Sequence, residues 1–287
     1  MNDLGTLGGS NALALYINDP GQIAGLSDTS TMVNPKTKVP PQHPFLWDPH
    51  SNHGNGKMRD VGTLGGTLVS SIGGINQRGQ FVGQMSLADE QSFHAFKWNG
   101  SKLLDLGTFG GPNSNPLAIN ELGWVVGEAD YPTGCSGPAQ HAVLWRHGAM
   151  TDLGVISGTV ISVANGINAK GQVVGASFSC DFSKATAFLW ERGRLYDLNK
   201  LIASSSMYLD FALEINDRGE IAGDGLVNGV THAVVLIPCE ETKGDCGGGV
   251  ARGATAPVAL PPSIRNILLR REGRRGAFGR PVFSNIF

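Results

Sequence analysis

The feature that most constrains the fold is an Ile-Asn pair that returns five times within the first 238 residues. The pairs are Ile17-Asn18, Ile75-Asn76, Ile119-Asn120, Ile167-Asn168 and Ile215-Asn216. They are separated by 58, 44, 48 and 48 residues, and a glycine follows each Asn three residues later and again seven residues later. So regular a spacing indicates a tandem repeat, in which each copy is one supersecondary unit.

Each repeat begins with the pattern of a β-hairpin. Asn tolerates the left-handed backbone region and Gly takes positive φ freely, so Asn-x-x-Gly between apolar runs predicts a tight turn. The strand after the turn carries two adjacent apolar residues before its glycine, as in Val173-Val174-Gly175, which is expected of strands covered on both faces. The glycine inside that strand predicts close approach of a neighbouring unit.

Two further strands complete the unit. A third strand ends in Trp in four of the repeats, and a fourth ends in Asp-Val-Gly, Asp-Leu-Gly or Asp-Leu-Asn. Four strands per unit is the composition of a propeller blade. The fifth unit stops at Pro238 without its fourth strand, and the missing Asp-Leu-Gly stands at Asp3 instead. We therefore predict an all-β fold, a five-bladed β-propeller at residues 1–238 in which an N-terminal strand at residues 3–7 closes the last blade.

The composition sets limits on what this fold can bind. With 41 Gly and 16% charged residues the chain favours short strands and turns over helices. The repeats lack the broad basic patch expected for nucleic acid binding. No apolar run approaches the length of a membrane span, and no secretory signal is visible at the N-terminus. Residues 239–287 are rich in Gly, Pro and Arg and are predicted to form a disordered C-terminal tail.

The four cysteines occur in two pairs. Cys135 and Cys180 fall in loops of successive repeats, and Cys239 and Cys246 follow the last repeat. Free thiols and a zinc site are alternatives, but neither pair has C-x-x-C spacing or a nearby pair of His residues. We predict the disulfides Cys135–Cys180 and Cys239–Cys246, which require an oxidising compartment.

Three strings recur in fixed order: Asp-Leu-Gly-Thr-Leu-Gly-Gly, Ile-Asn-x-x-Gly-x-Val-Val-Gly and His-Ala-Phe-x-Trp. Together they cover nearly all of residues 1–238, and in them the chain resembles the HAF family of probable extracellular repeat proteins of bacteria. The resemblance implies an exported, propeller-like protein located outside the cell or in its envelope. It supplies no catalytic residues.

The repeated polar and aromatic residues are better explained by structure than by chemistry. Equivalent positions in different blades lie a blade apart, so one His, Trp or Asp per repeat predicts hydrogen bonding, packing and turn formation. The sets are His43, His94, His141 and His232; Trp47, Trp98, Trp145 and Trp190; and Asp3, Asp60, Asp105, Asp152 and Asp197. No catalytic, metal or cofactor motif stands out, and we predict no metal and no cofactor.

Function is expected in the loops that differ between repeats, because variable loops on a rigid scaffold commonly carry binding residues. The two longest join the second and third strands at residues 26–42 and 128–140. Asp130, Tyr131 and Asn113 are the predicted ligand contacts, since a Tyr beside an acid can stack on and bond to a sugar or peptide. We predict an exported, non-enzymatic, monomeric module that binds carbohydrate, peptide or an envelope protein. The alternatives are a glycosidase or lyase acting at one propeller face, and an inert fragment of a longer array.

Overall fold

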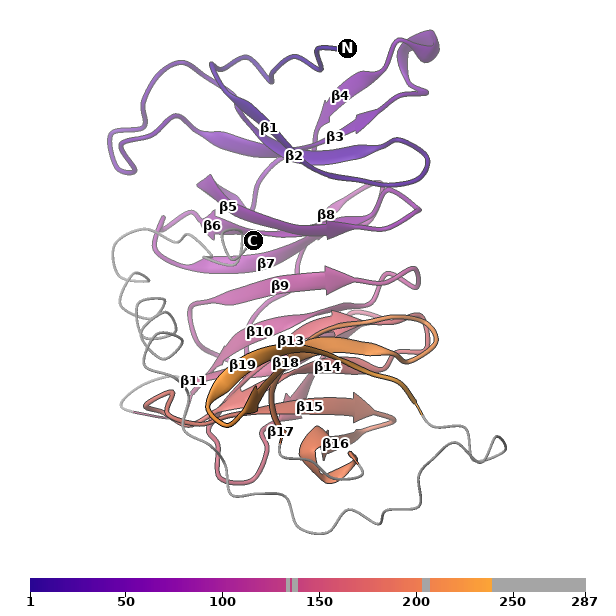
Figure 1. Cartoon of the computed structure of the whole chain (residues 1–287). Helices are drawn as coiled ribbons and strands as arrows, with labels where there is room; N and C mark the ends of the chain where they lie inside the picture. Colours follow the sequence, from indigo (N-terminus) through magenta and orange to yellow (C-terminus); the bar gives the residue numbers. More distant parts are fainter. Residues whose placement is uncertain (133–134, 136–138, 203–206, 239–287) are drawn as a thin grey trace. The chain divides into compact units, whose positions relative to one another are not determined.

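The computed structural model describes residues 1–132, 135, 139–202 and 207–238. In these residues it contains nineteen β-strands and two short 3-10 helices, so the all-β prediction is confirmed (Figure 1). The strands form five separate sheets, which we name A to E in chain order. The predicted tail at residues 239–287, with Cys239 and Cys246, lies outside the described residues.

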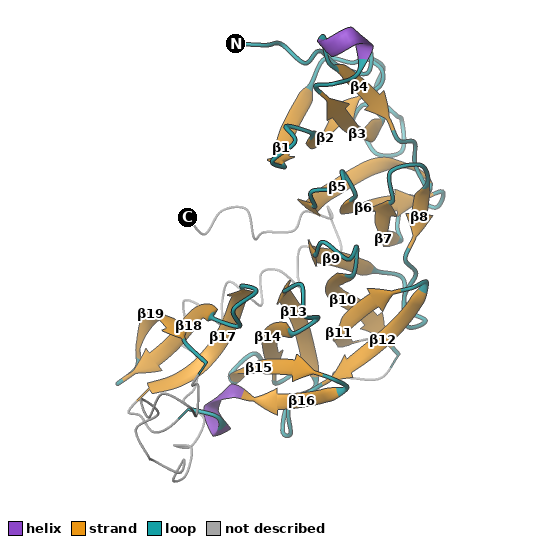
Figure 2. Cartoon of the chain, turned by 90° about the vertical axis from the view of Figure 1, so that its right-hand side faces the viewer, coloured by secondary structure: helices purple, strands orange, loops and turns teal. Residues whose placement is uncertain are grey.

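Every sheet is a meander in which strands that follow one another in the chain lie side by side (Figure 2). Sheet A contains β1 (Ala12–Ile17), β2 (Ile23–Asp28), β3 (Gln42–Asp48) and β4 (Lys57–Asp60). Sheet B contains β5 (Gly65–Ile75), β6 (Phe81–Leu87), β7 (Phe93–Trp98) and β8 (Leu103–Asp105). Sheet C contains β9 (Ser114–Ile119), β10 (Val125–Tyr131), β11 (Ala139–Arg146) and β12 (Ala149–Gly154). Sheet D contains β13 (Ile161–Ile167), β14 (Val173–Phe178), β15 (Ala185–Glu191) and β16 (Arg194–Asp197). Sheet E contains β17 (Met207–Ile215), β18 (Ile221–Val227) and β19 (Val230–Leu236).

The 3-10 helices are short interruptions beside this pattern: η1 (Asn52–Gly54) follows β3, and η2 (Leu198–Lys200) follows β16. The chain divides into two compact units, Met1–Val125 and the described residues from Val126 onward. Sheets A and B lie in the first unit, and sheets D and E in the second.

The turn between the first two strands has the predicted Asn-x-x-Gly chemistry. In sheet B the Asn76 backbone N–H donates to the Gln80 carbonyl at 2.9 Å, and the Gly79 N–H donates to the Asn76 carbonyl at 3.0 Å. Gly79 has φ 70°, a conformation that favours glycine. Asn76 Oδ1 accepts from the backbone N–H of Gln80 at 3.0 Å. The turn is therefore determined by local sequence, and the same bonds recur in all five sheets.

The Asn side chain also links one sheet to the next, which the sequence did not indicate. In the first unit Asn18 Nδ2 donates to the carbonyl of Asn76 at 2.9 Å, and Asn76 Nδ2 donates to that of Asn120 at 3.1 Å. In the second unit Asn168 Nδ2 donates to the carbonyl of Asn216 at 3.0 Å. A buried amide that satisfies a neighbouring carbonyl in this way fixes the stacking of the repeats.

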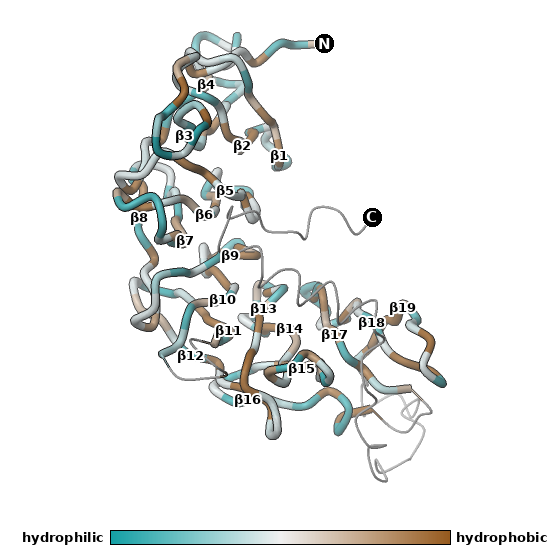
Figure 3. Tube along the Cα trace, turned by 90° about the vertical axis from the view of Figure 1, so that its left-hand side faces the viewer, coloured by the Kyte–Doolittle hydropathy of each residue, from teal (hydrophilic) through white to brown (hydrophobic). Residues whose placement is uncertain are grey.

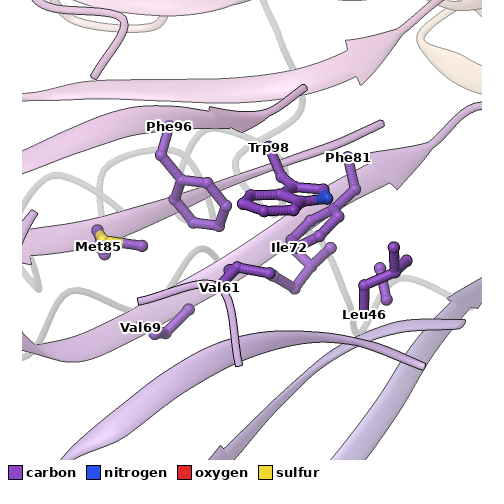
Figure 4. Packing of buried hydrophobic residues seen from close by; sticks show 9 residues of the cluster. Leu46, Val61, Val69, Ile72, Phe81, Met85, Phe96 and Trp98 are labelled. Carbon is purple, nitrogen blue, oxygen red and sulfur yellow. The ribbon is translucent and has the colours of Figure 1, made fainter. Parts of the chain in front are cut away.

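The core of the first unit lies between sheets A and B (Figure 4). Phe81 and Phe96 are fully buried there, with ring centroids 5.9 Å apart in an edge-to-face arrangement. The repeated Trp lies at the same place: Trp98 is 3% exposed, and the guanidinium of Arg59 from sheet A lies 4.6 Å from its ring. The hydropathy of the chain alternates over short segments, as expected when each strand contributes only a few core residues (Figure 3).

The glycine inside the second strand is needed for a reason different from the predicted one. A Cβ at Gly83 would lie 2.3 Å from the carbonyl oxygen of Ser71 and 2.7 Å from the ring of Phe96. Both residues belong to sheet B itself, on the strands either side of Gly83. The glycine therefore makes room for the aromatic ring of its own sheet, and not for a neighbouring unit.

The closing strand predicted at residues 3–7 is wrong, because the first strand of the chain begins at Ala12. Residues 3–7 form no strand, and the backbone N–H of Leu7 donates to Ser27 Oγ of sheet A at 3.0 Å. The fourth strands of sheets A, B and D end at the Asp, so residues after Asp3 correspond to the connection that leads into the next sheet. Sheet E has three strands in the described residues.

Candidate functional site

The loop between β2 and β3 is ordered and presents an apolar tip. It spans residues 29–41, which is shorter than the predicted 26–42 because β2 continues to Asp28 and β3 begins at Gln42. Asn34 Nδ2 donates to Thr67 Oγ1 of sheet B at 2.9 Å, which fastens the loop. Met32 is 77% exposed and Val33 56% exposed. Two apolar side chains held in solvent by a fastened loop are suited to contact a partner.

The loop between β10 and β11 is also shorter than predicted. Residues 128–131 continue β10, and residues 139–140 open β11. Asp130 is therefore a strand residue, 3% exposed, and its Oδ1 accepts from Gln140 Nε2 at 2.9 Å. The carboxylate thus makes a hydrogen bond within sheet C.

The other two predicted contacts lie in different units. Tyr131 ends β10 and stacks on the ring of His141, with centroids 4.1 Å apart and planes 7° apart. Asn113 lies in the first unit, where its Oδ1 accepts from the backbone N–H of Phe93 at 3.1 Å. Asp130 and Tyr131 are consecutive residues of β10, so their side chains point to opposite faces of the strand, and the ligand role of all three residues stays a prediction.

Three of the repeated His residues form pairs with the repeated Asp. The Nδ1 atoms of His43, His94 and His141 lie 2.9, 2.9 and 3.0 Å from carboxylate oxygens of Asp60, Asp105 and Asp152. Each Asp also accepts the backbone N–H two residues later, at 2.7 to 2.8 Å. The pairs thus join the third strand to the fourth and hold the turn that follows.

The electrostatics of one such pair favour the charged carboxylate. Burial raises the pKa of Asp152, but hydrogen bonds from His141 and Gly154 together with the charge of His141 outweigh it, and the pKa lies below its ordinary value. In sheet D, Thr186 replaces the His, and its Oγ1 lies 2.7 Å from the hydroxyl of Tyr208 in sheet E. The sequence predicted structural roles for the His and Asp sets but not their pairing.

The disulfide predicted between Cys135 and Cys180 is formed, with a Cα–Cα distance of 5.4 Å. It joins the loop after β10 to the loop after β14, 45 residues later. Cross-linking of this kind limits the unfolded chain more than the folded one.

A buried acidic residue in sheet E was missed. Asp210 is 2% exposed, and its Oδ1 has no hydrogen-bond partner among the described residues. Burial above all, with the charge of Asp224 adding to it, raises the pKa of Asp210 to about 6, against the opposing effect of backbone N–H groups. Burial also raises the pKa of Asp224. These carboxyls could have been singled out because no other repeat has acids at both positions.

The described residues contain neither a metal site nor a membrane-spanning helix. No group of three or more His, Cys, Asp or Glu side chains in this part of the chain could hold a metal ion. Among its helices none has the length and apolar character needed to cross a membrane.

No protein-family model and no curated protein matches this sequence. Among solved structures, the chain is similar to the β-propeller domain of the trilobed protease from Pyrococcus furiosus, at 10% identity and a TM-score of 0.48, over 79% of this chain and 68% of that one. It is also similar to an acylaminoacyl peptidase from Pyrococcus horikoshii, at 14% identity and a TM-score of 0.45, over 85% of this chain and 39% of that one. The hydrazine synthase of Kuenenia stuttgartiensis has 10% identity and a TM-score of 0.38, over 87% of this chain and 40% of that one. This chain therefore spans less than half the length of the latter two, and none of the three assigns it an activity.

Proposed function

We propose that this protein is an exported, non-enzymatic binding module built on a β-propeller scaffold. One contrast carries the proposal: the turn between the first and second strands is the same in all five sheets, whereas the connection between the second and third strands differs in each. A repeated scaffold with variable loops is the arrangement in which binding residues are placed on loops. The ligand class proposed is a carbohydrate, a peptide or another envelope protein.

We propose further that the ring is closed by its own ends, with five blades. The N-terminal segment supports this because it has the geometry of an internal connection. The Gly5 N–H donates to Asp3 Oδ1 at 2.9 Å, as the Gly107 N–H does to Asp105 Oδ1 at 2.8 Å. Asp3 would then pair with His232, the repeated His of sheet E.

Sheets A and E, the first and last in the chain, also support closure. Both leave apolar side chains in solvent. The exposed residues are Leu13, Leu15 and Ile17 in sheet A and Val230, Val235 and Ile237 in or beside sheet E. Apolar surface of this kind favours a partner, and closure would supply one for each sheet.

Export is proposed from the resemblance to the HAF family and from the disulfide. The Cys135–Cys180 bond is compatible with an oxidising compartment, in which such bonds persist. Peptide mapping without reductant, on protein recovered from its native cell, should find the two cysteines joined. Recovery of both as free thiols would contradict export.

The binding face is tested by changing the loop tip. A glycan and peptide array probed with the protein should give a signal that Met32→Ser with Val33→Ser reduces at least tenfold. Leu122→Ser is a matched control, because Leu122 is an apolar residue 49% exposed at the invariant Asn120 turn. Equal loss in the control, or an unchanged signal when residues 29–41 and 132–138 are both shortened, would contradict the assignment of the loops.

A further inference from the structure

Sheets B and E have the same register around a β-bulge in their first strand. In sheet B, Val69 lies opposite Met85 and Ser71 opposite Gln84, so Ser70 is the extra residue. In sheet E, Leu209 lies opposite Gly225 and Phe211 opposite Asp224, so Asp210 is the extra residue. Asp210 and Asp224 therefore occupy the positions of Ser70 and Gln84.

In sheet B these two positions are joined by a hydrogen bond. Ser70 Oγ donates to Gln84 Oε1 at 2.6 Å and lies 3.3 Å from the Gln84 carbonyl oxygen. The bulge thus directs its side chain toward a side-chain oxygen and a backbone oxygen of the second strand. A residue at this place needs a proton to donate, since both neighbours are acceptors.

An ionised Asp210 has no such proton. Two ionised carboxylates at these positions would repel one another, and the buried Oδ1 of Asp210 would remain without a donor. Protonation removes both costs at once, because a neutral carboxyl can donate to the other carboxylate as the Ser70 hydroxyl donates to Gln84. We propose that Asp210 and Asp224 form a proton-binding site, in which one proton is held between the two carboxyls and stabilises sheet E.

The surroundings of the pair agree with this assignment. Asp224 on β18 is the titratable neighbour whose charge acts on Asp210, and its backbone lies opposite Ala233 on β19. Tyr208 on β17 has a raised pKa, first because it is buried and also because of the charges of Asp197 on β16 and Asp210, while its bond to Thr186 acts the other way. His232 on β19 lies opposite Gly225, the residue after Asp224. The elements around the pair thus contribute mainly acidic charge.

The direction of the pH dependence follows from the pKa of Asp210, which is raised from 3.8 to about 6. Between these two pH values the folded state binds more protons than the unfolded state, so unfolding becomes easier as the pH rises. The stabilisation is complete below the unfolded pKa and is lost as the pH passes about 6. The site is therefore filled in mildly acidic surroundings and empty in alkaline ones. It does not depend on the proposed binding function.

The test restores the pair found in sheet B. The double variant Asp210→Ser, Asp224→Gln should recreate the hydroxyl–amide bond and remove the proton site. In urea unfolding of the whole chain, the ratio of unfolding equilibrium constants between the wild type and this variant should rise about 100-fold from pH 4 to pH 7.5, since each unit of pKa shift is tenfold. A ratio that stays constant with pH would overturn the proposal.

Two further measurements cover the case in which that variant fails to fold. A carbon-13 titration of the wild-type Asp210 carboxyl should give a midpoint near pH 6 that falls in Asp224→Asn, and a midpoint near 4 in the wild type would overturn the proposal. The reciprocal variant, Ser70→Asp with Gln84→Asp, should introduce the same pH dependence into sheet B. Absence of that dependence in a folded reciprocal variant would contradict the role given to the bulge geometry.

Discussion

Sheets B and E are built on the same pattern but differ in what surrounds them. Both have the Asn-x-x-Gly turn, the same bulge in the first strand and the same glycine opposite the third strand. Sheet B has a fourth strand and a partly buried third strand, whereas sheet E has three strands in the described residues and a third strand largely in solvent. Local sequence therefore sets the strand register within a repeat. The stability of the repeat depends on how much of it the neighbouring repeats bury.

The largest difference between the two sheets is expected at the residue opposite the strand glycine. Phe96 lies opposite Gly83 and is fully buried, whereas Val234 lies opposite Gly223 and is half-buried. Phe96→Ala should lower the free energy of unfolding by about 4 kcal/mol, because it removes a buried ring and leaves a cavity. Val234→Ala should cost about 1 kcal/mol or less. Chemical denaturation measures both, and equal losses would show that sheet E is as well covered as sheet B.

The turn asparagines should give the next largest difference. Asn76 is 2% exposed and donates to the Gln80 side chain and to the Asn120 carbonyl. Asn76→Ala therefore leaves buried acceptors and N–H groups without hydrogen-bond partners. We expect a loss of about 2 kcal/mol in the free energy of unfolding. Asn216 in sheet E is exposed, and Asn216→Ala should cost about 0.5 kcal/mol. If the two variants melt alike, the Asn hydrogen bonds between sheets contribute nothing to stability and only the bonds within each turn matter.

A smaller effect is expected from the repeated His. His94 has a side chain 16% exposed and contacts Asp105, so His94→Ala should cost up to about 1 kcal/mol. His232→Ala should lower the free energy of unfolding as much only if Asp3 pairs with His232 as proposed. Thermal unfolding in low salt would compare the two variants, with Thr186→Ala as a third measure of the same position in sheet D.

The connection between the second and third strands should differ between the two sheets in its response to acid. In sheet B the hydroxyl and backbone N–H of Ser92 and the N–H of Gln91 lower the pKa of Asp89 to about 2. The stabilisation that these hydrogen bonds give the folded state is therefore present above the pKa of Asp89 in the unfolded chain. It is lost as the pH falls through about 2. In sheet E the same connection is the turn Asn228-Gly229, which has no carboxyl to titrate. A carboxyl titration by NMR checks this, and an Asp89 midpoint near 4 would contradict the bonds described.

The parts of the fold that the sequence could predict are those set by neighbouring residues. Asn76 and Gly79 specify their turn through their own backbone preferences, so five hairpins and their period followed directly. The bulge at Ser70 did not, because the extra residue leaves no break in the apolar pattern. The loop bounds failed for a similar reason, since the extension of β2 to Asp28 depends on its pairing with Gln42 across the loop.

The candidate sites were harder to predict because they depend on contacts between strands. The Cys135–Cys180 bond could be predicted because both residues occupy the same loop of successive repeats. Pairing of His94 with Asp105 joins residues on different strands and needed the register of β7 with β8. Asp210 and Asp224 lie 14 residues apart in the sequence, and only the register of β17 with β18 brings them to the positions of Ser70 and Gln84.

Closure of the ring by its own ends is the central claim, and a double-mutant cycle tests it most directly. The cycle of Asp3→Ala with His232→Ala is compared with the reference cycle of Asp105→Ala with His94→Ala in the same chain. Closure predicts that both pairs have a coupling energy of about 0.5 to 1 kcal/mol. Positive coupling in the reference pair together with none between Asp3 and His232 would contradict it.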